Sequence, residues 1–416
     1  MNDNIDTLVR QAVFGGDAEK QAARTEIRTK AADAGLYPAS IHDLYMAAGK
    51  NAYQNKSVPA INVRGITYDV SRAVFRAILK HDAAACIFEL ARSEMSYTKQ
   101  SPDEYVVAVL AAGLKEGYSG PVFIQADHTQ VNAKKYAADP DAELTAIKNL
   151  VKDAVAAGFY NIDIDSSTLV DLSRPTIDAQ QENNYTVAAD MTKFIRDLQP
   201  AGVTVSVGGE IGEVGKSNTT VEELRAYMDG YRKLLGPDLK GISKLSVQTG
   251  TAHGGVVLPD GSIADVKLDF NTIKELGKVA REEYSVGGIV QHGASTLPDE
   301  MFELFPKSGT LEVHLATGFQ NLVYDSEYFP KDLLNKVYGY LEDKFSDEKK
   351  AEDTHEQFIY KTRKKGWGGF KSETWHLPEE NLQGISSLLE KQFTFLFEKL
   401  NAADTVDLVA KYCPKP

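Results

Sequence analysis

Short apolar runs rich in β-branched residues recur along the chain from about residue 58, and each precedes a longer amphipathic stretch. A short apolar run predicts a buried strand, whereas apolar positions three and four residues apart predict a helix, as at residues 141–156 and 221–235. The spacing between successive runs suits strand–helix–strand units. The predicted strands cover residues 60–63, 85–90, 122–126, 161–165, 203–207, 244–248, 288–291 and 311–315.

Eight predicted strands that alternate with helices indicate an α/β protein. This alternation favours a closed (β/α)8 TIM barrel over an open doubly wound sheet. No G-x-G-x-x-G pattern follows the first predicted strand, which argues against a dinucleotide-binding fold. We therefore expect a barrel over residues 58–325, and we expect it to be the catalytic domain.

The segments on either side of the barrel are predicted to be helical. Residues 1–57 form an expected N-terminal helical segment, with a helix beginning where Ser40 and Asp43 resemble a capping box. Residues 326–416 form an expected C-terminal helical extension, which a bare barrel would not need. Its last helix has an apolar face that packs either on the barrel or on a neighbouring subunit, made by Leu382, Ile385, Leu389, Phe393, Leu396 and Leu400.

Composition narrows the class of protein. Of the 416 residues, 43% are hydrophobic and 25% are charged, which allows a large buried core. The net charge of −13 argues against a non-specific nucleic-acid partner. No apolar run reaches the roughly 18 residues that span a membrane, and the first residues lack the features of a signal peptide. Two cysteines, Cys86 and Cys413, cannot make a disulfide framework. We expect a cytoplasmic globular protein.

Histidines gather at the carboxyl ends of the predicted strands, where barrels of this kind carry their chemistry. His128, His253 and His292 follow the third, sixth and seventh strands. A closed barrel brings those ends around one cavity, and three neutral imidazoles with an open fourth position are typical of a catalytic Zn²⁺ site. The alternative interpretation is three hydrogen-bonded core histidines.

Other polar residues at these ends suggest the accompanying chemistry. Asp127 adjoins a predicted ligand, so it could exchange a proton with a substrate hydroxyl, or it could only orient a histidine. Gly254, Gly293 and Gly318 lie just past strand ends, with Ser295 and Thr317 nearby. Exposed backbone N–H groups and hydroxyls there would suit a phosphate or a carboxylate, although ordinary loop glycines would look the same.

Competing barrel chemistries fit less well. A Schiff-base aldolase needs a lysine in the active face, but Lys244 lies at the start of the sixth strand. An amidohydrolase-type site needs His-x-His after the first strand, which is absent. An enolase-type site could use Asp127, Asp165 and Glu210 but would leave the histidines without a role. Lewis-acid chemistry with three histidines is the better interpretation.

Residues 58–325 resemble the class II, metal-dependent ketose-bisphosphate aldolases, which act on fructose- and tagatose-bisphosphate. The likeness runs through PAINVRG, QADH, IDIDSS, GEIGEVG, TGTAHGG and HGASTLPDE. It implies reversible cleavage of a small phosphorylated sugar to dihydroxyacetone phosphate and an aldehyde, within carbohydrate metabolism such as glycolysis. Zn²⁺, or Co²⁺ or Mn²⁺ in its place, is the implied metal, and a monovalent cation is allowed beside it. We expect a homodimer or homotetramer.

The resemblance also implies a role for individual residues. His128, His253 and His292 match the metal ligands, and Asp127 matches the acid/base that acts on the C4 hydroxyl. Glu210 matches a glutamate near the metal. Positions that hold the phosphate of the dihydroxyacetone half are matched by Gly254, Gly293 and Ser295.

The departures from the family pattern fall on substrate-recognising positions. His314, followed by Thr317 and Gly318, replaces an asparagine-bearing motif on the eighth strand, and Arg92 stands near a position where relatives carry serine. The loop that supplies a proton-transferring glutamate in relatives is shortened around Glu213. We count all of these residues as candidate site residues.

Two alternatives to an aldolase remain open. One is a metal-dependent sugar or sugar-acid epimerase on the same scaffold, which the altered eighth strand favours. The other is a non-catalytic partner subunit of another aldolase, which the shortened loop suggests. A further hypothesis concerns the basic, glycine-rich segment KTRKKGWGGFK (361–371), which could bind the far anionic group of a substrate or could only form a solvated basic face.

Overall fold

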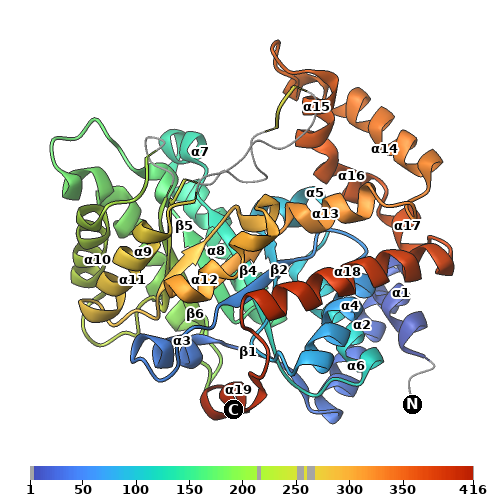
Figure 1. The fold of residues 1–416 in the computed structure, drawn as a ribbon, viewed down its shortest axis with the longest axis horizontal. Coiled ribbons are helices and arrows are strands. Elements are labelled where there is room, and N and C mark those ends of the chain that lie inside the picture. The colour runs from blue at the N-terminus through green and yellow to red at the C-terminus, as the bar shows by residue number, and fades with distance from the viewer. Residues whose placement is uncertain (1–3, 213–216, 251–256, 260–267, 416) are drawn as a thin grey trace.

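The computed structural model describes residues 4–212, 217–250, 257–259 and 268–415. The chain forms a closed barrel of eight parallel strands with helices around it (Figure 1), which confirms the predicted TIM barrel. The ring runs from the first barrel strand to the last, which pair with each other, and all eight predicted strands are present. They are β2 (Val58–Asn62), β3 (Ile87–Ala91), β4 (Gly120–Gln130), β5 (Asn161–Asp165), β6 (Ser206–Gly212), β7 (Lys244–Val247), β8 (Ile289–Gln291) and β9 (Glu312–Leu315).

The helices of the barrel begin and end where local signals place them. In α10, Thr220 and Glu223 form a capping box, and α8 begins after Asp139, whose carboxylate accepts from the N–H of Ala142. Gly158 ends α8 in a left-handed conformation that favours glycine. The helices after the successive strands are α4 (Thr67–His81), α5 (Arg92–Tyr97) with α6 (Pro102–Glu116), α7 (Ala133–Ala138) with α8 (Pro140–Ala157), α9 (Ile177–Leu198), α10 (Val221–Leu235), α11 (Phe270–Glu282), α12 (Leu304–Ser308) and α13 (Thr317–Tyr324).

One strand lies further along the chain than the pattern predicts. The expected strand at 203–207 is observed as β6, which continues through Gly208 and Gly209 to Gly212. A Cβ at Gly208 would lie 2.3 Å from an oxygen of Asp163, and one at Gly209 would lie 2.5 Å from the hydroxyl of Tyr227. These glycines are therefore part of the strand because no side chain fits there, and they do not mark its end.

Part of the N-terminal segment closes the amino end of the barrel, and the rest packs against α6 on the outside of the barrel. It contains α1 (Ile5–Phe14), α2 (Asp17–Asp33) and α3 (His42–Gly49), as expected, and also β1 (Leu36–Ala39), which the pattern did not predict. β1 pairs with the first residues of β4, below the residues of β4 that pair with β5. The helix predicted near Ser40 is α3, and its Tyr45 packs with Val58 and Leu311 in a core cluster at this end.

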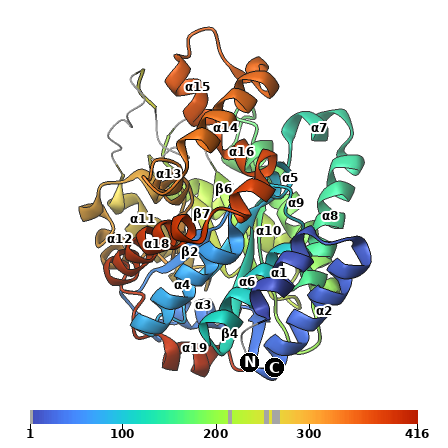
Figure 2. The same cartoon turned by 90° about the vertical axis from the view of Figure 1, so that its right-hand side faces the viewer.

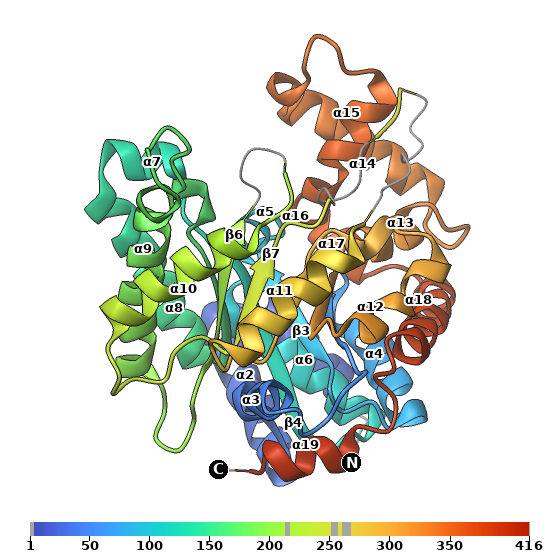
Figure 3. The same cartoon turned by 60° about the vertical axis from the view of Figure 1, so that its left-hand side comes forward.

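The C-terminal extension contacts the barrel at three places. Its bounds are α14 (Lys331–Lys344), α15 (His355–Thr362), α16 (Gly366–Gly369), α17 (Lys371–Trp375), α18 (Glu379–Lys399) and α19 (Val406–Tyr412). Figures 2 and 3 show α14 to α16 above one end of the barrel and α19 beside α3 at the other. Between them α18 packs along α4, so its apolar face covers the barrel. Among the described helices, none is both long and apolar enough to cross a membrane.

Candidate active site

A cavity of about 950 Å³ opens where the barrel strands end. Its wall includes Asp127 and His128 from β4, His292 after β8 and His314 from β9. The C-terminal extension contributes Lys364 from the segment above the barrel. One space therefore contains most of the polar strand-end residues that the sequence analysis selected.

A bulge in β4 explains why two neighbouring residues share this cavity. Successive residues of a regular strand face opposite sides, so Asp127 and His128 would ordinarily point apart. The register of β4 against β5 shifts between Ala126 and Thr129, and His128 has a φ of +39°. A left-handed backbone at a non-glycine residue costs on the order of 1–3 kcal/mol and concentrates at functional sites. The bulge thus re-aims the His128 side chain into the cavity beside Asp127.

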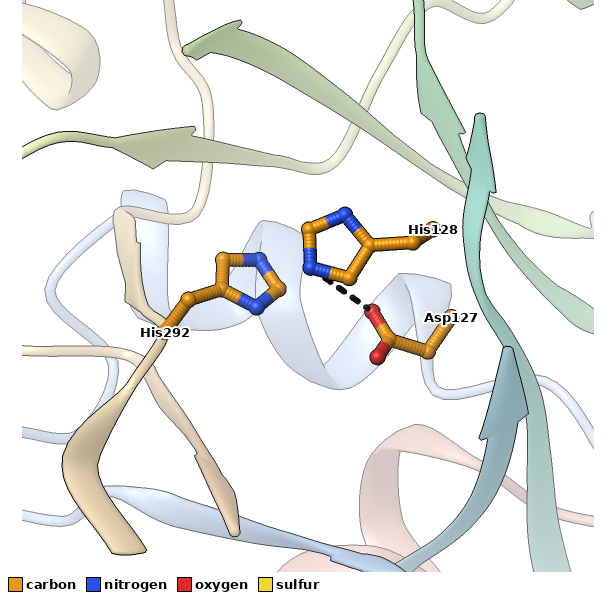
Figure 4. A group of neighbouring side chains, drawn as sticks. All are labelled: Asp127, His128 and His292. Carbon is orange, nitrogen blue, oxygen red and sulfur yellow. Dashed lines mark ion pairs between the residues drawn. The ribbon is translucent and has the colours of Figure 1, made fainter. Parts of the chain in front are cut away.

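Two of the three predicted metal ligands meet in the cavity. The ring centroids of His128 and His292 are 4.3 Å apart, and the Asp127 carboxylate lies beside His128, 3.9 Å from its Nε2 (Figure 4). One donor atom from each of Asp127, His128 and His292 falls within 4.8 Å of the others. Nitrogen and oxygen donors at this spacing fit a divalent cation such as Zn²⁺.

Hydrogen-bonding groups hold the two imidazoles in place. His128 Nδ1 lies 3.0 Å from Asp165 Oδ2 and 3.3 Å from Glu210 Oε2. His292 Nε2 lies 3.0 Å from the hydroxyl of Ser246. A carboxylate on one ring nitrogen fixes the orientation of a histidine and directs the other nitrogen elsewhere, here towards Asp127. Burial, together with the charge of Asp165, raises the pKa of Glu210 to about 7.

His314 lies below this group and contacts four acids, of which Asp163 is the most distant at 3.9 Å from Nε2. Its Nε2 is 2.6 Å from Glu312 Oε1, and its Nδ1 is 2.9 Å from Glu89 Oε2 and 3.3 Å from Asp127 Oδ1. Burial opposes charge on the ring, but the acids, Glu89 first among them, outweigh burial and hold the pKa of His314 well above its usual value. The eighth-strand histidine is therefore linked directly to the candidate acid/base.

Lys244 anchors a second set of charges in the barrel interior. Its Nζ lies 2.6 Å from Gln125 Oε1, 2.9 Å from Asp163 Oδ2 and 2.6 Å from Glu312 Oε1. Burial disfavours the ammonium charge, but Asp163 and Glu312 outweigh it and raise the pKa of Lys244. A lysine held in this way is no amine nucleophile. We call Lys244, Gln125, Asp163, Glu312, Glu89 and His314 the floor network.

The predicted substrate-binding residues separate into two groups. Gly293, Ser295 and Thr317 line the cavity, and Arg92 does too, although its guanidinium is 2.6 Å from Glu143 Oε1. Gly318 is not in the cavity wall but packs closely against Ser295, since a Cβ there would lie 2.6 Å from the backbone oxygen of Ser295. The other three predicted site residues, Glu213, His253 and Gly254, lie outside the residues that the structure describes.

Sequence reasoning did not select Glu89, Arg64 or Glu94 of the cavity wall, and it named Lys364 only as part of the basic segment 361–371. Glu89 lies within the apolar strand FELA, and a buried acid inside an apolar run was a signal that could have found it. Arg64, Glu94 and Lys364 stand on the rim, from β2, α5 and the C-terminal extension. Only the folded chain brings these three together.

A family model for class II fructose-bisphosphate aldolases matches residues 40–365. The chain belongs to this family. Membership in this family indicates an aldolase-type lyase, and the cavity with its imidazoles is the candidate active site. The matched residues extend beyond the barrel into the C-terminal extension. A search of curated proteins found no match to this chain.

Solved structures with the same fold include proteins of two kinds. The YdjI aldolase from Escherichia coli K12 is 12% identical with a TM-score of 0.54, over 88% of this chain and 99% of its own. A fructose-bisphosphate aldolase from Campylobacter jejuni is 19% identical with a TM-score of 0.52, over 89% and 97%. The fructuronate–tagaturonate epimerase UxaE from Cohnella laeviribosi is 11% identical with a TM-score of 0.62, over 92% and 86%. At these identities the likeness shows the fold alone.

Proposed function

We propose that this aldolase reversibly cleaves a phosphorylated ketose to dihydroxyacetone phosphate and an aldehyde. The observation that carries the proposal is the Asp127 carboxylate beside the His128 and His292 imidazoles, at the carboxyl ends of two barrel strands. A base and two metal-type ligands within one cavity are what a metal-assisted aldol cleavage needs. The family membership supports the same reaction class.

His128 and His292, with His253 by family resemblance, would hold Zn²⁺, or Co²⁺ or Mn²⁺. A bound divalent cation supplies Lewis-acid stabilisation of negative charge that develops on the ketone half. The donor set fits because two rings from different strands and one carboxylate converge within 4.8 Å of one another. A monovalent cation beside the metal stays a family-based proposal, as do a homodimer or homotetramer and a cytoplasmic location.

Asp127 would accept the proton of the C4 hydroxyl as the C3–C4 bond breaks. Burial alone would favour the neutral acid, but His128 and His314 outweigh it and hold the pKa of Asp127 well below its usual value. The group is therefore a carboxylate, ready to take a proton. Glu210, and Glu213 by resemblance, would pass protons within the same site, while Gly254, Gly293, Ser295, Thr317, Gly318 and Arg92 would bind the sugar and its phosphate.

Epimerisation of a sugar or sugar acid is the second candidate function. His314 favours it, because this imidazole touches Asp127 where most family members place asparagine. Bond cleavage followed by re-addition to the other carbonyl face would use the same metal and base. A non-catalytic partner role is less well supported, since it gives no reason for the converging donor atoms.

Metal removal and product analysis test the proposal. A chelator should abolish cleavage of phosphorylated ketoses, and Zn²⁺, Co²⁺ or Mn²⁺ should restore it. A coupled assay for dihydroxyacetone phosphate identifies the aldolase reaction, whereas one isomeric sugar as the product identifies the epimerase. Full activity in protein shown to be metal-free would contradict both candidates.

A further inference from the structure

We propose that Lys364 and Arg64 form a subsite for an anionic group of the substrate, a phosphate or a carboxylate. The subsite joins the end of β2 to the C-terminal extension, on the rim of the cavity that contains Asp127. It deepens the proposed function, on which it rests, by naming residues that would select a charged substrate.

Lys364 differs from the other basic residues of its segment. Among the described residues, Lys364 has no hydrogen bond or ion pair, and its Nζ lies 5.9 Å from the ring centroid of Tyr97. Every other cation of the segment 361–371 has an acidic partner. The pairs are Lys361 with Asp353 at 2.5 Å, Arg363 with Asp325 at 2.8 Å, Lys365 with Glu348, and Lys371 with Glu104 at 2.5 Å. The basic segment is therefore not a solvated face, and it brings one uncompensated charge to the cavity.

Arg64 faces this lysine from the barrel. Its Nε lies 2.7 Å from Glu94 Oε1, which fixes the guanidinium, and its Nη1 lies 3.5 Å from the hydroxyl of Thr317. Asn62 Nδ2 holds the second oxygen of Glu94 at 2.7 Å. Glu94 is thus occupied by Arg64 and Asn62, and Lys364 leaves an excess positive charge on the rim.

This arrangement is unfavourable without an anion. Burial lowers the pKa of Lys364, and the nearby charge of Arg64 lowers it further. A partly desolvated cation beside a second cation gains stability only from a negative partner. The acids whose charge favours Lys364, Glu94 and Glu348, already pair with Arg64 and Lys365, so a ligand in the cavity is the remaining source of a direct partner.

Close packing holds Lys364 in position. A Cβ at Gly65 would lie 2.2 Å from the ring of Trp367, and a Cβ at Gly368 would lie 1.9 Å from the backbone oxygen of Tyr97. Trp367 stacks on Tyr324 with ring centroids 4.4 Å apart. The glycines of the segment therefore allow tight contact between α16 and the barrel, and they do not make the segment flexible. The ammonium is presented from a rigid support, which limits the entropy lost on binding.

Anion binding measured without turnover tests the subsite. Isothermal titration of the full-length protein with inorganic phosphate and with gluconate, a carboxylate probe, compares wild type with Lys364→Gln and Lys364→Arg. Lys365→Gln is the matched control, because the neighbouring lysine is paired with Glu348. Loss of one charged hydrogen bond should weaken binding about 10- to 100-fold in Lys364→Gln, with recovery in Lys364→Arg and no change in Lys365→Gln.

The two probes identify the ligand class. Weakened phosphate binding alone points to a phosphorylated end of the substrate, and weakened gluconate binding alone points to a sugar acid. The proposal is overturned if Lys364→Gln binds both anions like wild type while its circular dichroism is unchanged. Because neither titration needs cleavage, failure of the aldolase assay would leave this result interpretable.

Discussion

Two lysines of this protein lie in opposite electrostatic environments. Lys244, in the floor network, is 1% exposed and has three oxygen atoms within 2.9 Å of its Nζ, two of them from carboxylates. Lys364, on the rim, is only partly buried and has no such oxygen among the described residues. The more deeply buried lysine is therefore the better compensated one, as the cost of burying charge requires.

The comparison distinguishes charges that stabilise the barrel from charges that we propose to bind a ligand. In the floor network, Lys244 pairs directly with the carboxylates of Asp163 and Glu312. On the rim, Arg64 and Lys364 leave an excess of positive charge. This excess lowers the stability of the fold and favours the binding of an anion. Asp127 lies between the two regions, since it contacts His314 of the floor network and also lines the cavity.

The largest effect is expected from the floor network. Lys244→Met should lower the free energy of unfolding by about 3–5 kcal/mol, because Asp163 and Glu312 would stay buried with His314 as the only cation beside them among the described residues. Urea denaturation followed by circular dichroism measures this loss. Lys240→Met is the control, since the Lys240 ammonium donates to the hydroxyl of Thr204 at the surface. If the two variants had the same free energy of unfolding, the floor network would not stabilise the barrel.

Asp127→Asn tests whether Asp127 acts in catalysis or, like the floor network, stabilises the barrel. As an acid/base, its loss should lower kcat about 10²- to 10⁴-fold with little change in metal content or melting temperature. Asp163→Asn is the matched floor variant, and it should lose stability while its folded fraction keeps kcat. Steady-state kinetics with metal analysis gives both readings. A stability loss in Asp127→Asn without a fall in kcat would assign Asp127 to the floor.

The pH dependence of the metal-free protein should report on Glu89. Burial raises the pKa of Glu89 to about 8 against the opposing charge of His314. Between the unfolded pKa of about 4.3 and pH 8, the folded state keeps a proton that the unfolded state has lost. Stability should therefore fall with rising pH, by up to about 1.4 kcal/mol per unit. Glu89→Gln should flatten this slope in denaturant titrations, and an unchanged slope would contradict the assignment.

The smallest effect is expected on the rim. The pKa of Lys364 is lowered, so the folded state disfavours the charged form at every pH below that pKa. Lys364→Gln should therefore raise the melting temperature by roughly 1–2 °C at neutral pH, without added anion. Lys365→Gln, which breaks an existing pair, should not. A lower melting temperature in Lys364→Gln would show that its charge is already compensated.

The barrel was largely predictable because each strand is a local apolar run. The prediction of strands failed at β1 and β6, where contacts with distant parts of the chain determine the local structure. β1 is a short LYPA segment that becomes a strand only because β4 offers an edge, and β6 continues through two glycines because Asp163 and Tyr227 leave no space. In the site, the selection of Asp127, His128 and His292 followed from strand-end position, whereas the bulge that turns Asp127 and His128 to one side left no pattern.

The sequence alone determined the alternation of strands and helices, the family and the histidine-rich strand ends, because these depend on local periodicity and motifs. Tertiary structure alone decided which charges are satisfied. Lys364 and Lys365 are adjacent and alike in the chain, yet one pairs with Glu348 and the other lines the cavity. The physical reason is that the energy of a charge depends on its distance to other charges and to water, and folding sets both distances.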